Sequence, residues 1–294
     1  MFTATLIAAD IFDAGDFSAA SDRVASAGAQ VLGARWIDEA KALDVDFTGD
    51  AAAVRAAVEG AFARTDAIVQ KTAERERSLI VADMDSTMIT IECIDELADY
   101  AGIKPQIAEV TERAMRGELD FEEALRSRVA LLQGLSESVI EQCLAERVVI
   151  MPGARALVRT MRALGGMAVL VSGGFTRFAE PVAREIGFNK AIANRLGIRD
   201  GVLTGQVDGE IVGAQTKRQT LQDTLATTGW SAAQSLAVGD GANDIPMIEV
   251  AGLGVAYHAK PKTAAAAHAC VNHGDLTAIL YAMGFPRARW ACLD

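Results

Sequence analysis

The sequence predicts an α/β protein in which a doubly wound, mostly parallel sheet with a helical cap follows a small α+β domain. From residue 153 onward, short apolar runs alternate with helical patterns. Such alternation is typical of an open sheet covered by helices on both faces. Residues 92–147 are helical in pattern and contain no strand. Residues 1–72 instead follow the order β-α-β-β-α-β, which indicates a ferredoxin-like unit.

The composition of the chain is that of a globular protein and argues against nucleic-acid binding. Its 294 residues are enough for about two domains. Hydrophobic residues make up 51% of the chain and charged residues 23%, which is far from the composition of disordered chains. The formal net charge of −11 argues against the basic face that nucleic-acid binders present.

Cysteine usage and the first residues indicate a cytoplasmic protein that does not enter a membrane. The four cysteines lie far apart without metal-ligand spacing, so we expect reduced thiols. No run approaches the ~18 apolar residues that span a bilayer. Residues 1–10 contain no Lys or Arg, unlike the start of a signal peptide.

The N-terminal unit is expected to contain four strands and two helices. Asp50 precedes an alanine-rich helical run and is therefore the expected N-cap of the second helix. The expected strands are residues 3–8, 31–36, 42–47 and 66–69, and the first helix is residues 17–27. This order resembles the ACT domains, which are small regulatory domains that bind amino acids. The resemblance leaves open an amino-acid effector site, a homodimer contact and a purely structural role.

A charged connector, residues 71–77, follows the N-terminal unit. Its composition is that of a solvated segment, and we place the domain boundary inside it. The expected domains are residues 1–72 and residues 73–294, with a helical cap inserted at about residues 90–147.

The helical block should form a cap above the sheet. Its expected helices are residues 94–101, 105–115, 121–133 and 136–145, with breaks at Gly102, Gly117 and Gly134. Pro105 at a helix start and Ser136 as an N-cap support two of these boundaries. The block is larger than a plain crossover between two strands requires, so we expect it to act as a lid.

The remaining elements complete the sheet. Its expected strands are residues 79–82, 167–171, 235–238, 253–256 and 270–272, with an antiparallel excursion over residues 194–208. The expected helices are residues 153–164, 176–186, 216–228, 261–267 and 275–283. In an open sheet of this kind, ligands bind at the carboxyl ends of the strands. Polar residues that follow strands are therefore the candidates for a site.

Three strands end in polar residues that the topology would gather at one edge of the sheet. Asp83 and Asp85 follow residues 79–82. The other two polar segments are Ser172-Gly173-Gly174 and Gly239-Asp240-Gly241-Ala242-Asn243-Asp244. Buried carboxylates are costly without a cation or another partner. We therefore expect a functional site at this edge.

Each motif also has a purely structural interpretation. Asp85 and Ser86 would serve equally well as caps of the next helix. A Ser-Gly-Gly sequence is more often an ordinary loop, and a single helical lysine such as Lys217 is commonly a surface residue. The order of the motifs along the chain favours the functional interpretation.

Together the motifs supply the components of a phosphoryl-transfer site. Asp83, Asp85 and Asp240 offer the oxygen ligands that Mg²⁺ prefers. The Ser172-Gly173 pair, expected at a helix start, offers a hydroxyl and backbone N–H groups to an anion. Lys217 adds a positive charge. Carboxylates, a divalent cation, an anion site and a lysine are the parts that phosphoryl transfer requires.

In this order the motifs resemble those of the haloacid dehalogenase superfamily. The resemblance covers residue 79 to about residue 272 and rests on Asp83-Met84-Asp85-Ser86-Thr87, Ser172-Gly173-Gly174, Lys217 and Gly239-Asp240-Gly241-Ala242-Asn243-Asp244. The chain is most similar to members that hydrolyse O-phospho-L-serine, because Glu92 and Arg128 match their substrate-recognition positions in the cap. The resemblance implies a HAD-like fold and a Mg²⁺-dependent phosphatase that performs the last step of serine biosynthesis.

The resemblance also implies roles for individual residues. Asp83 would attack phosphorus and form an aspartyl-phosphate, while Asp85 would protonate the leaving oxygen and then activate water. Glu92 would bind the α-ammonium group of the substrate and Arg128 its carboxylate. Mg²⁺ would be held by the carboxylates of Asp83 and Asp240 and by the backbone carbonyl of Asp85.

The remaining motif residues would serve the phosphoryl group. Ser172, Gly173 and Lys217 would neutralise its charge. Asn243 would help to place the phosphate or the water, and Asp244 would orient Lys217 or the metal shell. A related activity stays open, because a phosphotransferase that uses an acceptor alcohol such as homoserine would share these motifs.

Overall fold

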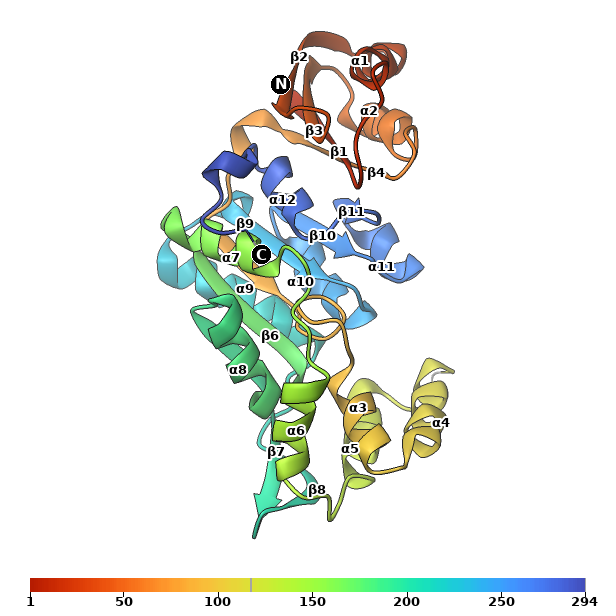
Figure 1. Ribbon diagram of the computed structural model, residues 1–294, viewed down its shortest axis with the longest axis vertical. Helices are drawn as coiled ribbons and strands as arrows, with labels where there is room; N and C mark the ends of the chain where they lie inside the picture. The colour runs from red at the N-terminus through yellow and green to blue at the C-terminus, as the bar shows by residue number, and fades with distance from the viewer. Residues whose placement is uncertain (117, 294) are drawn as a thin grey trace.

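The structure, a computed structural model, describes residues 1–116 and 118–293 (Figure 1). The expected helix break at Gly117 lies outside the described residues. Figure 1 shows the N-terminal domain at one end of the molecule, the large sheet in the middle and the cap helices at the opposite end.

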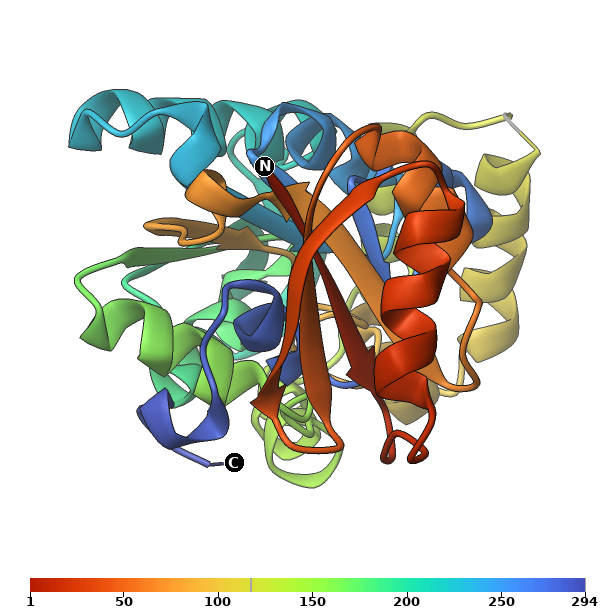
Figure 2. The same ribbon diagram turned by 90° about the horizontal axis from the view of Figure 1, so that it is seen from above.

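The N-terminal domain is an antiparallel sheet with two helices, as predicted. Its strand order is β2-β3-β1-β4, which is the ferredoxin-like arrangement. Asp50 caps α2 by accepting hydrogen bonds from the N–H groups of Ala52 (2.9 Å) and Ala53 (3.3 Å), which confirms the predicted N-cap. Figure 2 shows α1 lying along this sheet. The elements are β1 (Phe2–Ala8), α1 (Asp16–Ser26), β2 (Gln30–Asp38), β3 (Ala42–Thr48), α2 (Ala51–Val58) and β4 (Thr65–Lys71).

A seven-stranded sheet in the order β11-β10-β9-β5-β6-β7-β8 forms the centre of the larger domain. Every pairing in it is parallel except that of β7 with β8. The predicted parallel sheet and its antiparallel excursion are therefore confirmed. The strands are β5 (Leu79–Ala82), β6 (Met167–Phe175), β7 (Lys190–Arg199), β8 (Val202–Asp208), β9 (Ser235–Gly239), β10 (Leu253–Tyr257) and β11 (Ala269–Val271).

Helices cover both faces of this sheet, because successive strand residues point to opposite faces. Ile80 and Ala82 of β5 pack with α7, α8 and α12, whereas Leu79 and Val81 pack with α9 and α10. The helix α10 is absent from the predicted elements because it is short and follows directly on a polar motif. The helices are α7 (Ala154–Ala163), α8 (Thr176–Ile186), α9 (Ala214–Thr228), α10 (Ile245–Val250), α11 (Pro261–Ala266) and α12 (Thr277–Ala282).

The cap is helical, as predicted, but two of its boundaries differ from the prediction. α5 ends before residue 133, and the N-cap of α6 is Glu137 rather than Ser136. The residues between these helices pair with the β7–β8 hairpin: Gly134 N–H donates to the carbonyl of Leu203 (2.9 Å), and Ser136 forms a bridge with Val202. Ser136 Oγ also accepts a hydrogen bond from the N–H of Ser138 (3.3 Å), so its side chain contacts the start of α6 from one position further out than the N-cap. The cap helices are α3 (Cys93–Tyr100), α4 (Lys104–Met115), α5 (Phe121–Ala130) and α6 (Ser138–Glu146).

The N-terminal domain docks onto the larger domain through buried polar contacts beside β11 and α12. Asp66 of β4 accepts hydrogen bonds from the backbone N–H groups of Asn272 (2.7 Å) and Gly274 (2.8 Å). Arg75 is buried and binds the Asp44 carboxylate through both terminal nitrogens (2.8 and 2.9 Å). Arg75 also donates through Nε to the carbonyl of Ala282 at the end of α12 (3.0 Å), so it joins the N-terminal sheet to the larger domain.

Three of the four cysteines pack in the protein interior. Cys93, Cys143 and Cys270 are buried free thiols, and Cys292 is a partly exposed one. This burial fits the expected packing role. Within the described residues, no helix has the combination of length and apolarity that crossing a membrane requires.

Candidate active site

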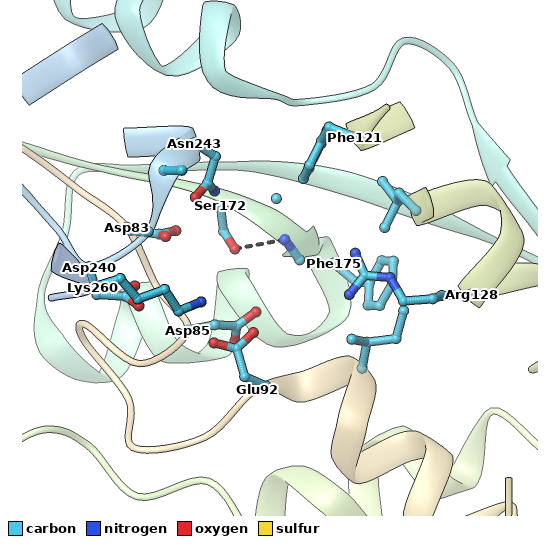
Figure 3. Close-up of a pocket in the computed structure, with 16 residues that line it drawn as sticks. Asp83, Asp85, Glu92, Phe121, Arg128, Ser172, Phe175, Asp240, Asn243 and Lys260 are labelled. Atoms are coloured by element: carbon cyan, nitrogen blue, oxygen red, sulfur yellow. Dashed lines mark hydrogen bonds between the residues drawn. The ribbon is translucent and has the colours of Figure 1, made fainter. Parts of the chain in front are cut away.

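The strand ends bring three aspartates together at the carboxyl edge of the large sheet. β5 and β9 are neighbours, so Asp83 and Asp240, which directly follow them, lie side by side (Figure 3). Asp244 reaches the same point from a short turn, η3 (Ala242–Asp244). One carboxylate oxygen of each aspartate lies within 4.8 Å of the others. The two motifs therefore meet at one edge of the sheet, as the topology predicts.

Lys217 binds two of these carboxylates from the buried side. Its ammonium Nζ lies 2.7 Å from Asp83 Oδ1 and 2.7 Å from Asp244 Oδ1, and its side chain is fully buried. Burial lowers the pKa of Lys217, but the carboxylates of Asp244 and Asp83 outweigh burial and raise it. The lysine is therefore a charged member of the cluster, and the surface interpretation of Lys217 is wrong.

The aspartate cluster has the composition of a site for a hard divalent cation. When all three carboxylates are ionised, the single ammonium of Lys217 compensates only one of their three charges. Three oxygen donors within 4.8 Å and an excess of two negative charges fit one divalent cation. Burial, together with the charge of Asp83, raises the pKa of Asp240, as expected where carboxylates are crowded. The carboxylate of Asp85 is not part of this cluster, so its metal contact through the backbone carbonyl stays a prediction.

Asp85 lies in a different environment from Asp83. Its Oδ1 atom is buried and has no hydrogen-bond partner among the described residues. Burial, reinforced by the charge of Glu92, raises the pKa of Asp85 well above its usual range, although contacts with Cys93 oppose the shift. A carboxyl group that favours its protonated form can donate a proton. The two aspartates of the motif therefore differ: Asp83 forms an ion pair with Lys217, whereas Asp85 has no ion pair within the described part of the chain.

Ser172, Gly173 and Gly174 lie within β6 rather than in a turn at a helix start, which corrects the prediction. β6 pairs with β7 at Val171 and again at Phe175, and the residues between them form an irregularity in the ladder. Bulges of this kind are common beside active sites, where they re-aim side chains. Ser172 Oγ accepts a hydrogen bond from the N–H of Gly174 (2.8 Å; Figure 3). All three residues line the pocket described next.

The two glycines of this segment leave space for side chains that approach them closely. A Cβ atom at Gly174 would lie 2.9 Å from Asp85 Oδ2 and 3.0 Å from Ser172 Oγ. A Cβ atom at Gly173 would lie 3.1 Å from the ring of Phe121, the first residue of α5. Phe121 thereby connects the cap to the edge of the sheet.

The cap covers a pocket of about 310 Å³ over this edge. The Asp83–Asp240 pair lies at one end, Arg128 lies at the other, and Glu92 lies between them (Figure 3). The described contacts of Arg128 include a hydrogen bond to the carbonyl of its own helix (3.3 Å) but no ion pair. The predicted residues that line the pocket are Asp83, Asp85, Glu92, Arg128, Ser172, Gly173, Asp240 and Asn243, while Lys217 and Asp244 lie buried behind them.

Two residues beside the carboxylates fall outside the predicted set. Thr87 Oγ1 donates a hydrogen bond to Asp240 Oδ1 (3.4 Å), and its position as the last residue of the first aspartate motif is the signal that could have identified it. Lys260 lines the pocket from the loop after β10. Its place just beyond the carboxyl end of a buried strand is the corresponding signal.

A lysine-anchored carboxylate cluster beneath a cap, at the carboxyl edge of a doubly wound sheet, is typical of proteins that transfer phosphoryl groups with the help of a metal. The sequence comparisons make this class more specific. The chain belongs to the haloacid dehalogenase-like hydrolase family, whose model matches residues 80–249. All four motifs, together with Glu92 and Arg128, lie within the matched segment.

Individual relatives narrow the similarity further. Phosphoserine phosphatase from Streptomyces coelicolor is 46% identical over 220 residues, which cover 75% of this chain and 53% of that protein. The unliganded crystal structure of a probable phosphoserine phosphatase from Vibrio cholerae has a TM-score of 0.78 at 35% identity, and the match covers 99% of this chain and 90% of that one. A substrate-bound phosphoserine phosphatase complex has a TM-score of 0.65 at 37% identity, with coverages of 70% and 98%.

The relatives also differ from this chain in length. The chain spans about half the length of the curated relatives from Streptomyces coelicolor (53%) and Mycobacterium tuberculosis (54%). The similarity therefore establishes the family to which this chain belongs. The activity is a proposal, which follows below.

Proposed function

We propose that this chain is a Mg²⁺-dependent phosphatase that hydrolyses O-phospho-L-serine to serine and phosphate. The observation that carries the proposal is one pocket with a lysine-anchored carboxylate cluster at one end and Arg128 at the other. Phosphoserine has a phosphate group and an amino-acid group, and the two ends of the pocket match them. Relatives described as phosphoserine phosphatases, one of them with substrate bound, support this substrate.

The aspartate cluster would hold the metal. Asp83 and Asp240 offer carboxylate oxygens, Asp85 offers its backbone carbonyl, and Asp244 lies behind them on Lys217. When bound, Mg²⁺ supplies positive charge that stabilises the transferring phosphoryl group. The excess of two negative charges in the cluster supports a divalent ion at this place.

Asp83 and Asp85 would divide the chemistry between them. Lys217 Nζ (2.7 Å) and the N–H of Met84 (2.8 Å) both bind Asp83 Oδ1, which leaves Oδ2 to attack phosphorus. The bond from Oδ2 to phosphorus forms while the bond from phosphorus to the serine oxygen breaks, and Asp85 gives its proton to that oxygen. Asp85 then takes a proton from the water that hydrolyses the aspartyl-phosphate.

The remaining pocket residues would orient the two ends of the substrate. Ser172 and Gly173 offer a hydroxyl and backbone N–H groups to the phosphate oxygens, and Asn243 lies on the same side. Arg128 would bind the substrate carboxylate through its planar fork. Glu92, which accepts a hydrogen bond from Ser86 Oγ (2.8 Å), would bind the α-ammonium group.

A panel of phosphate monoesters tests the proposed substrate. With Mg²⁺ present, we expect faster phosphate release from phosphoserine than from sugar phosphates, which lack the ammonium and carboxylate groups that Glu92 and Arg128 would bind. Phosphothreonine has both groups and one extra methyl group, so slower release from it would report how closely the pocket fits the substrate side chain. Chelation of the metal should abolish release from every member. Equal rates across the panel would contradict the assigned amino-acid site.

A pair of arginine variants on α5 serves as the control for this panel. Arg128→Met should raise the KM for phosphoserine by roughly tenfold to 100-fold, the scale of a lost charge-assisted contact. Arg126 lies two residues away on the surface, where it is paired with Glu122 (2.7 Å). Arg126→Met should therefore leave the KM unchanged.

We further propose that residues 1–72 and 73–294 are separate structural units and that the first binds an amino-acid effector. The ferredoxin-like order of its elements supports this proposal, because ACT domains share that order. Titration calorimetry of the full chain with serine should then detect a binding event that persists in Arg128→Met, which lacks the carboxylate contact of the active site. The absence of such heat would leave a structural or dimer-forming role.

A further inference from the structure

We propose that Lys260 is an additional phosphate-binding residue of this site and that its ammonium group contacts the solvent-facing oxygens of the substrate phosphate. The inference rests on the proposed phosphatase function, because the phosphate is assigned to the end of the pocket that Lys260 lines. Lys260 lies outside the four motifs and outside the predicted site residues.

The backbone of Lys260 is fixed beside Asp240. Its N–H donates a hydrogen bond to the carbonyl of Asp240 (3.2 Å), and its own carbonyl accepts from the N–H groups of Thr263 and Ala264 (3.0 Å each). Both of its backbone polar groups are therefore bonded. Only the side chain is free to move, and Figure 3 shows its ammonium pointing into the pocket.

The loop that carries Lys260 is also held at its start. His258 has a left-handed backbone conformation, with φ of +42°, which a non-glycine residue keeps only where its surroundings enforce it. Its N–H donates to the carbonyl of Val271 (2.8 Å), and its ring Nε2 is hydrogen-bonded to the carbonyl of Gly274 (2.9 Å). A loop anchored in this way presents Lys260 at a defined place.

Among the described residues, the charge of Lys260 is unpaired, whereas that of Lys217 is shared between two carboxylates. Lys217 has two carboxylates at 2.7 Å. Among the described residues, Lys260 has no acidic partner within 4.0 Å, although its charge is close enough to Asp240 to oppose the rise in the pKa of that carboxyl group. Arg128 is likewise without an ion pair in the described structure, but it lies at the amino-acid end of the pocket (Figure 3).

The charge balance of the site favours an additional positive charge near the substrate phosphate. With all three carboxylates ionised, the cluster, the ammonium of Lys217 and one divalent cation would together have no net charge. A phosphate monoester arrives with about two negative charges at neutral pH. Lys260 supplies a positive charge on the open side of that phosphate. Because the side chain is exposed, its contribution should be moderate and should weaken with ionic strength.

Phosphate binding to the full chain tests the inference. Calorimetric titration with inorganic phosphate at saturating Mg²⁺, set by a prior Mg²⁺ titration of each variant, would compare wild type with Lys260→Met, Lys260→Arg and Lys262→Met. Lys262 is an exposed lysine two residues away that does not line the pocket, so it is the matched control. We expect Lys260→Met to weaken phosphate binding roughly threefold to tenfold at low ionic strength, and the other two variants to resemble wild type.

Steady-state kinetics should show the same effect. Lys260→Met should raise the KM for phosphoserine by a factor similar to its loss of phosphate binding, with a smaller change in kcat. The difference between wild type and Lys260→Met should shrink at high ionic strength. If Lys260→Met binds phosphate as tightly as Lys262→Met does, the inference is overturned. If the wild type fails to hydrolyse phosphoserine but its phosphate binding still depends on Lys260, the proposed function fails and the phosphate contact stands.

Discussion

Asp83→Asn is expected to lower phosphate release from phosphoserine by about 10⁴-fold or more, because an amide cannot attack phosphorus as a carboxylate does. The fold should survive this change. An asparagine Oδ1 can still accept the hydrogen bond from Met84 N–H (2.8 Å), and Lys217 keeps its contact with Asp244 (2.7 Å). Steady-state phosphate release and thermal unfolding of the same preparation measure the two effects.

Asp223→Asn is the matched control for this variant. Asp223 lies on the exposed surface of α9, where its carboxylate accepts a hydrogen bond from Gln219 (2.7 Å). The same chemical change at this place should leave turnover at the wild-type rate. Wild-type turnover by Asp83→Asn would remove Asp83 as the nucleophile.

Lys217→Met is expected to damage both stability and activity. The substitution leaves the buried carboxylates of Asp83 and Asp244 without the ammonium that each contacts at 2.7 Å. Breaking a buried ion pair by removing one partner costs about 3–5 kcal/mol, so we expect a loss of this order in the free energy of unfolding without metal. Phosphate release should also fall by about 10²-fold or more, because Lys217 no longer contributes charge at the phosphoryl group.

The effect of Mg²⁺ on stability provides a further test of the role of Lys217. A divalent cation would replace part of the missing positive charge, so added Mg²⁺ should stabilise Lys217→Met more than it stabilises the wild type. Arg218→Met, at the exposed neighbouring position, should change neither the free energy of unfolding nor the rate of phosphate release. An unchanged free energy of unfolding in metal-free Lys217→Met, measured by chemical denaturation, would contradict the central position of Lys217 in the cluster.

The convergence of the site could be predicted from the sequence because it follows from topology. Asp83 and Asp240 directly follow buried strands, and the carboxyl ends of parallel strands share one edge of a sheet. The alternating contacts of Leu79 and Ile80 with opposite cores likewise follow from the two-residue period of a strand. Neither conclusion requires knowledge of which residues contact each other across the fold.

The errors occur where tertiary contacts override local preference. α5 ends at Ala130 rather than at residue 133, and the Gly134 N–H that follows it is bound to the carbonyl of Leu203 in the hairpin (2.9 Å). Ser172-Gly173-Gly174 has the composition of a turn, yet β6 continues through it to Phe175. Lys260 lies outside the predicted set because its place in the pocket depends on β10 lying beside β9. A single sequence shows that Lys260 follows a buried strand but not which strand lies beside which.

Product stoichiometry tests the central claim most directly. The full chain, incubated with O-phospho-L-serine and Mg²⁺, should release serine and inorganic phosphate in equal amounts, and chelation of the metal should stop both. The same ratio should hold when an acceptor alcohol such as homoserine is added. Serine formed without matching phosphate, or no reaction with phosphoserine at all, would contradict the assignment of this site as a phosphoserine hydrolase.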